Sequence, residues 1–167
     1  MDVSEFHDDG VRCIGWSLPN SGWDDLSATI CQFLTDALTG ILQECSGEQL
    51  NWIEMNYWPD SGRLMVFPSQ SGPLGDRDEP IFFQLCSGYL TEEWNRIAAI
   101  VDQPEQQERQ WEKLATRLWD RVSVCLSTGD AGETLKLARE KQTIKLAAYH
   151  YNPGEGIFRL PELTDYP

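Results

Sequence analysis

The chain contains few of the residues that carry most enzymatic and metal-binding chemistry. It has two histidines, His7 and His150, and five cysteines, no two of which lie within twelve residues of each other. The lack of a CxxC pair excludes a zinc ribbon and a thioredoxin-like redox motif. Neither GxGxxG, GxxxxGK[ST] nor HExxH occurs. The sequence therefore predicts no cofactor and no metal ion.

Long apolar runs are also missing, so the sequence predicts no transmembrane helix. The first ten residues, MDVSEFHDDG, are acidic and lack the basic and apolar regions of a secretory signal. We therefore expect a cytoplasmic protein. Its length of 167 residues favours a single domain over 1–167, with residues 1–20 and 161–167 as loose ends.

Basic residues are scarce in the first part of the chain. The whole chain carries 13 Lys and Arg against 27 Asp and Glu, a net charge of −14. Residues 1–95 hold 16 of these acids, three arginines and no lysine, whereas residues 96–167 hold 11 acids and 10 bases. This charge disfavours nucleic acid and anionic membranes as partners and favours a basic protein. The uneven placement predicts an acidic surface in the first part of the chain.

The apolar periodicity predicts an α+β fold. Apolar residues at helical spacing predict a first helix from Trp23 towards Gly47. A second helical stretch follows a predicted N-cap at Thr91 and extends to Gly129. Within it, Pro104 either breaks the helix or opens a new one. Asp130 and Glu133 resemble a capping box for a short helix to Lys141. Strand patterns cover 51–58, 63–67, 81–86, 143–151 and 157–160, with 11–16 as a further short candidate. Because hairpins dominate, we expect a mainly antiparallel sheet of about five strands with helices on one face.

The cysteines and histidines are interpreted as structural. Cys31, Cys45 and Cys125 lie in helical patterns, where a thiol acts as a small hydrophobic group, so we expect no disulfide and no catalytic thiol. His150 lies in a strand pattern and is interpreted as a half-buried strand residue, with a catalytic base as the alternative. Three loop acids, Asp76, Asp78 and Glu79, come closest to an oxygen-rich cation site and are interpreted as solvated.

The strand over 51–58 carries tryptophans beside acids. Trp52, Glu54 and Trp58 share one strand face, opposite Ile53 and Tyr57. If the second face is core, the tryptophans are partly exposed and form a hot-spot surface for a protein partner. The alternative is that a helix covers this face too, which makes it a second core. The predicted partner-binding residues are Asp24, Asp25, Trp52, Glu54, Trp58, Asp60, Asp76, Asp78 and Glu79.

In size, charge and architecture the chain resembles the immunity proteins of bacterial toxin–immunity systems. The resemblance covers the stretch Trp52–Phe67, the strand Ile81–Phe83 and the long tryptophan-bearing helix. It implies a cytoplasmic bacterial protein without enzymatic activity, which neutralises a basic partner such as a toxin or nuclease. The alternatives are a small enzyme that uses carboxylates with His150, and a homodimeric scaffold with the long helix as its interface.

Overall fold

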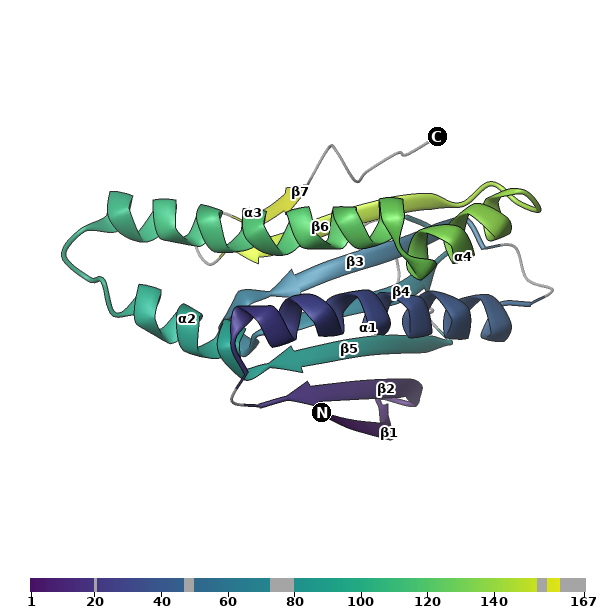
Figure 1. The fold of residues 1–167 in the computed structure, drawn as a ribbon, viewed down its shortest axis with the longest axis horizontal. Helices are drawn as coiled ribbons and strands as arrows, with labels where there is room; N and C mark the ends of the chain where they lie inside the picture. Colours follow the sequence, from purple (N-terminus) through teal and green to yellow (C-terminus); the bar gives the residue numbers. More distant parts are fainter. Residues whose placement is uncertain (20, 47–49, 73–79, 153–155, 160–167) are drawn as a thin grey trace.

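The computed structural model describes residues 1–19, 21–46, 50–72, 80–152 and 156–159 (Figure 1). The strands are β1 (Asp2–Asp8), β2 (Val11–Leu18), β3 (Trp52–Trp58), β4 (Arg63–Ser69), β5 (Ile81–Ser87), β6 (Lys145–Asn152) and β7 (Gly156–Arg159). The helices are α1 (Trp23–Glu44), α2 (Gly88–Ala98), α3 (Pro104–Thr128) and α4 (Asp130–Arg139), with a short 3-10 turn η1 (Pro59–Ser61).

The α+β class is confirmed, but the prediction of a mainly antiparallel sheet of about five strands was wrong. All seven strands form one sheet in the order β1-β2-β5-β4-β3-β6-β7, and the sheet is mixed. Its centre is the antiparallel set β5-β4-β3. On either side an antiparallel hairpin, β1–β2 or β6–β7, joins this centre through a parallel pair. The two parallel pairs join segments distant in sequence, which local patterns cannot predict.

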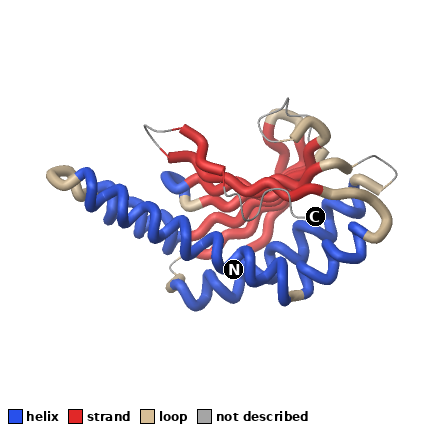
Figure 2. The backbone as a smooth tube through the Cα atoms, turned by 90° about the horizontal axis from the view of Figure 1, so that it is seen from above, coloured by secondary structure: helices blue, strands red, loops and turns tan. Residues whose placement is uncertain are grey.

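Helices α1, α3 and α4 cover one face of the sheet, as the edge-on view in Figure 2 shows. The helix-facing strand residues and the apolar stripe of α1 form the core between the two layers. Fully buried side chains from both layers include Ile30, Phe33, Leu34, Ile53, Met55, Tyr57 and Leu64. Burial of each large apolar side chain contributes about 1.5–3 kcal/mol to the free energy of folding. The contact between sheet and helices therefore determines which face of the sheet the helices cover and which face stays free of them.

Residues 1–18 form a hairpin, so the prediction of loose N-terminal residues was wrong. Each residue of β1 is paired with β2, from Asp2 opposite Ser17 to Asp8 opposite Val11. The two linking residues, Asp9 and Gly10, have φ values of 48° and 85°. Positive φ at both central residues is typical of the type I′ turn, which Asp-Gly favours and whose twist suits a hairpin. Residues 161–167 lie outside the described part of the chain.

Two predicted helix caps were also wrong. The helix expected after Thr91 begins at Gly88, and Ser87 caps it by accepting a hydrogen bond from the Leu90 amide at 3.4 Å. Helix α4 begins at Asp130 but has no side-chain cap, so the predicted capping box does not form. Pro104 stands at the start of α3, where its missing amide hydrogen costs nothing, and this prediction is confirmed.

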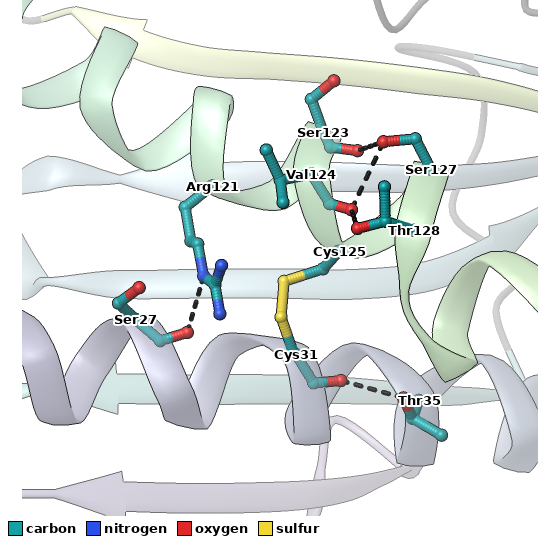
Figure 3. Close-up of a disulfide and its surroundings, with 9 residues drawn as sticks. All are labelled: Ser27, Cys31, Thr35, Arg121, Ser123, Val124, Cys125, Ser127 and Thr128. Atoms are coloured by element: carbon teal, nitrogen blue, oxygen red, sulfur yellow. Dashed lines mark hydrogen bonds between the residues drawn. A yellow bond between two sulfur atoms is a disulfide. The ribbon is translucent and has the colours of Figure 1, made fainter.

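A disulfide between Cys31 of α1 and Cys125 of α3 joins two helices of the same layer (Figure 3). The prediction that all five cysteines are unbridged was therefore wrong. Both residues lie where the two helices face each other, with their Cα atoms 5.2 Å apart, within the usual range for a disulfide. One turn away, the Arg121 side chain donates a hydrogen bond to the Ser27 carbonyl oxygen at 2.8 Å. The apolar periodicity of the sequence places both cysteines in helices, but it does not show which sides of the two helices face each other.

None of the helices in the described ranges combines the length and apolar character needed to cross a membrane.

Candidate functional site

The sheet face opposite the helices carries polar and aromatic side chains. Strand alternation and register place every second residue of neighbouring strands on this face. One row across the sheet runs from Gln84 through Met65 and Asn56 to Tyr149. The next row includes Arg63 and Trp58, which are opposite each other on β4 and β3. No helix of the described chain covers this surface, which we call the open face (Figure 2).

A groove of about 410 Å³ lies on the open face. It reaches from the β1–β2 turn across β5 and β4 to the end of β3. Its lining residues are Asp8, Asp9, Val11, Trp58, Arg63, Met65, Phe67, Phe82 and Gln84. A volume of several hundred Å³ lined mainly by apolar and aromatic side chains with a few charged groups is typical of a binding site. Among the residues that the structure describes, the titratable groups of the lining are the carboxylates of Asp8 and Asp9 and the guanidinium of Arg63.

The groove has an acidic end and a basic end. Asp8 and Asp9 are exposed and lie at the β1–β2 turn. At the other end Arg63 is half-buried, and its Nε donates a hydrogen bond to the Ser61 hydroxyl oxygen at 2.9 Å. Because this bond holds Arg63 next to Trp58, the positive charge is kept at one end. The acidic end is therefore the end that attracts a cation.

Aromatic rings support the acidic end. The rings of Phe6 and Phe82 meet edge to face, with centroids 6.5 Å apart and planes at 85°. Phe6 packs above Gly15 of β2, where an added Cβ would lie 3.0 Å from the ring. A side chain at position 15 would require the Phe6 ring to move by a few tenths of an ångström, so glycine at this strand position allows the close approach. Asp8 and Asp9 thus line the groove together with Phe82, one ring of this aromatic pair.

The structure separates the residues that the sequence predicts to form one partner surface. Trp58 lies in the groove, and Asp60 is exposed in the adjoining turn η1. Trp52 is half-buried further along β3, where the Lys145 Nζ lies 5.1 Å from its ring centroid. Asp24 and Asp25 are exposed in the first turn of α1, in the helix layer. Asp76, Asp78 and Glu79 lie outside the described residues.

Glu54 is buried, and the prediction that it is part of an exposed surface was wrong. Its side chain is on the open face but only 2% of the residue is exposed, and Tyr149 donates a hydrogen bond to its Oε2 at 2.8 Å. The adjacent Asn56 is also buried, and its Oδ1 has no hydrogen-bond partner among the described residues. The centre of the open face is thus polar but closed to a partner, whereas the groove is open to solvent.

Two acids that line the groove were not predicted. Asp8 and Asp9 were assigned to a loose terminus because the first ten residues are polar. The Asp9-Gly10 pair before the apolar run Val11–Trp16 was a usable signal, because Asp-Gly is a strong hairpin turn. Recognising that turn would have placed both acids at a sheet edge instead of in a loose segment.

His150 lies on the helix-facing side of β6, away from the groove. Its Nδ1 accepts a hydrogen bond from the Trp119 indole N–H of α3 at 3.3 Å. Burial lowers the pKa of His150, because the charged imidazolium is poorly solvated between the sheet and α3. The prediction of a partly buried strand histidine is confirmed.

This histidine gives an expected pH dependence. Because the pKa of His150 is lower in the folded than in the unfolded protein, the unfolded state binds more protons as the pH falls. His150 therefore contributes stability that is complete above the unfolded pKa of about 6.5 and is lost as the pH falls through the folded pKa. We expect urea denaturation to show less loss of stability between pH 7 and pH 5 in His150→Gln, which keeps an acceptor but does not titrate. Parallel curves for the two proteins would contradict this.

Two cysteines also lie on the open face. Burial raises the pKa of Cys13 and of Cys86, so both are held as thiols and are poor nucleophiles. Among the residues that the structure describes, no cluster of three or more His, Cys, Asp or Glu is placed to hold a metal ion.

No protein-family model matches the chain, and comparison with curated proteins and with solved structures also gives no match. The fold and the groove thus define the chain only as a two-layer α+β protein with an acidic, aromatic groove on its helix-free face.

Proposed function

We propose that the protein is a non-enzymatic binding domain that inhibits a basic protein, such as a toxin or nuclease, through the groove on its open face. The observation that carries the proposal is the combination of Asp8 and Asp9 with aromatic walls in one solvent-accessible groove. A lysine or arginine side chain that enters this groove meets carboxylates at one end and aromatic side chains along its length. The carboxylates favour a cation over a neutral side chain, and an aromatic ring favours a cation that lies over its face.

The charge of the whole chain supports a basic partner. A net charge of −14 attracts a positively charged protein from a distance and speeds their encounter. Short-range specificity then comes from the groove, where Arg63 repels a second cation and so fixes the direction in which a basic side chain enters. A nuclease needs a basic cleft to hold its substrate, so a protein that covers this cleft with acids inhibits it directly.

We place the inhibitor in the cytoplasm of the bacterial cell that it protects. Glutathione and thioredoxin keep most cytosolic thiols reduced, so Cys31 and Cys125 are then expected as thiols until the protein meets an oxidising environment. Alkylation of the protein in intact cells, followed by mass measurement, reports this state. A fully oxidised pair in growing cells would argue for an oxidising compartment instead.

The direct test uses the product of the neighbouring gene, since immunity proteins are encoded beside their toxins. The toxin domain of that product is purified, and its toxic or nuclease activity is measured with and without this protein. We expect inhibition and a complex whose affinity falls with added salt. If that product is not bound, or is bound without inhibition, the inhibitor proposal fails. Elution of the free protein at twice 19.1 kDa would favour the homodimer alternative.

Charge reversal at the groove is expected to weaken this complex strongly. Asp8→Lys with Asp9→Lys places two cations where we expect the partner's cation, so the affinity should fall by about a hundredfold or more. The control is Asp24→Lys with Asp25→Lys, which changes the net charge equally but lies in the helix layer. Its effect should be limited to a smaller loss that disappears at high salt. Equal losses from the two variants, measured by calorimetry, would contradict binding through the groove.

A further inference from the structure

Strand β1 is an edge strand, and its outer side is not paired with any strand in the described chain. The sheet order places it last, next to β2, and all seven of its residues are exposed. An unpaired edge presents backbone amides and carbonyl oxygens that can pair with another strand. Figure 1 shows β1 below β2 at the border of the sheet, with neither a helix nor a loop drawn over its outer side.

The hairpin register shows which backbone groups point outward. In a two-residue hairpin the residues that flank the turn, here Asp8 and Val11, exchange hydrogen bonds, and the pattern then alternates along the strands. Phe6 is therefore bonded inward to Cys13, whereas His7, Glu5 and Val3 direct their N–H and C=O groups outward. Three evenly spaced residues thus offer a ladder for an added strand.

The side chains of β1 favour a basic strand. Val3 and Phe6 are 56% and 37% exposed, so the strand offers apolar contacts on both faces. Its charged side chains are Asp2, Glu5 and Asp8, with neither lysine nor arginine. The nearby base, Arg12 of β2, is engaged by Glu5 at 2.8 Å and by Glu44 of α1. The edge therefore presents a net negative charge, which continues into the acidic end of the groove at Asp8 and Asp9.

We propose that an extended, lysine- or arginine-rich segment of the partner adds to β1 as a new edge strand, with its basic side chains directed towards the acids of β1 and of the groove. This inference rests on the proposed function and names the part of the partner that binds. Main-chain hydrogen bonds supply affinity, and alternate side chains supply specificity, as in other cases of strand addition.

A second copy of the chain is a poor occupant of the same edge. Antiparallel pairing of β1 with β1 centred on Glu5, the register that pairs the most residues, places Glu5 opposite Glu5 and Asp2 opposite Asp8, and like charges on paired strands are destabilising. The acids thus suppress self-association and favour a basic strand, which is how natural proteins protect exposed edges.

The test uses a synthetic peptide of four Lys-Val repeats with blocked ends, together with the full-length protein. Hydrogen exchange is followed by NMR at the outward amides of Val3, Glu5 and His7, with Phe6 as the inward reference. We expect the peptide to slow exchange at the three outward amides by about tenfold near saturation, because bonded amides exchange only on opening. A Glu-Val repeat of equal length, and a Lys-Val repeat N-methylated at every residue, should leave exchange unchanged. The first has the wrong charge, and the methyl groups of the second block pairing along either edge of the peptide. Equal protection by the N-methylated peptide, or no protection by the Lys-Val peptide, overturns the proposal.

A backbone variant separates strand addition from simple attraction. Val3→Pro with His7→Pro removes two outward amides without removing an inward hydrogen bond, and edge strands tolerate proline. The matched control is Val3→Ala with His7→Ala. Peptide affinity should fall by about tenfold in the proline variant relative to the alanine control. Retained inward protection at Phe6 shows that β1 remains folded in both variants. Equal affinity of the two variants overturns strand addition.

The two proposals fail differently. A toxin that binds the groove without protecting Val3, Glu5 and His7 leaves the proposed function standing and overturns strand addition. A neighbouring-gene product that is not bound, together with peptide-dependent protection of these amides, overturns the choice of partner but supports the edge.

Discussion

Reduction of the Cys31–Cys125 disulfide is expected to lower the free energy of unfolding by about 4–5 kcal/mol, because the bond closes a loop with a sequence separation of 94 residues. Cross-linking restricts the unfolded chain, and the restriction grows with loop length. For a protein of this size the melting temperature should fall by about 8–20 °C. Thermal denaturation with and without a phosphine reductant measures the change, and mass measurement after alkylation verifies reduction.

Two variants separate the stability that comes from the disulfide bond from the stability that comes from packing of the cysteine side chains. Cys31→Ala with Cys125→Ala should melt close to the reduced protein and should not respond to reductant. Cys45→Ala removes another buried cysteine, outside this disulfide, and should keep its response to reductant. If the fully reduced wild-type protein melts at the same temperature as the oxidised form, the bond does not stabilise the fold.

Gly62→Ala is expected to destabilise the protein by about 2–5 kcal/mol, through a strained backbone and a direct clash. Gly62 has a φ of 58°, in the left-handed region that favours glycine. An added Cβ would lie 2.6 Å from the Ser87 carbonyl oxygen and 2.8 Å from the Thr91 amide nitrogen, both in the backbone at the start of α2. These atoms have little room to move, because the Ser87 amide is itself hydrogen-bonded to the Gly62 oxygen at 3.0 Å.

Gly10→Ala is the matched control for this clash. Gly10 also has a positive φ, of 85°, but an added Cβ would meet nothing within 4 Å. This variant should therefore cost only the backbone term, about 1–2 kcal/mol. The difference between the two variants, measured by urea denaturation, gives the cost of moving α2 away from the η1 turn. Equal losses would show that the close approach between Gly62 and α2 contributes nothing.

Local patterns predicted the elements better than their arrangement. The alternation around the turn 59–62 predicted the β3–β4 hairpin, and the apolar stripe after Trp23 predicted α1, because both depend on neighbours a few residues apart. The pairing of β2 with β5 was not predictable in this way, since it is set by which segments can cover the same helix layer. The facing positions of Cys31 and Cys125 likewise depend on how two helices pack.

The candidate site was predicted in part for the same reason. The alternation of the strand correctly placed Trp58 on the sheet face opposite the core. It does not determine how much of a side chain on that face is exposed to solvent. Glu54 is buried beside Tyr149, although the sequence suggested exposure. Asp8 and Asp9 join Trp58 in one groove only because the hairpin attaches to β5, a contact between distant segments.

The arrangement of the sheet also implies an order of assembly. The central strands β3, β4 and β5 follow one another in sequence and pair as neighbours, so their contacts close short loops and can form early. Each outer hairpin has a local turn of its own, but it attaches to the centre only through a parallel pairing of distant segments. We therefore expect the β1–β2 hairpin to dock late in folding and to detach at a lower free energy than the centre of the sheet. Strand β1, to which we propose that the partner adds a strand, is thus also among the last strands to dock during folding.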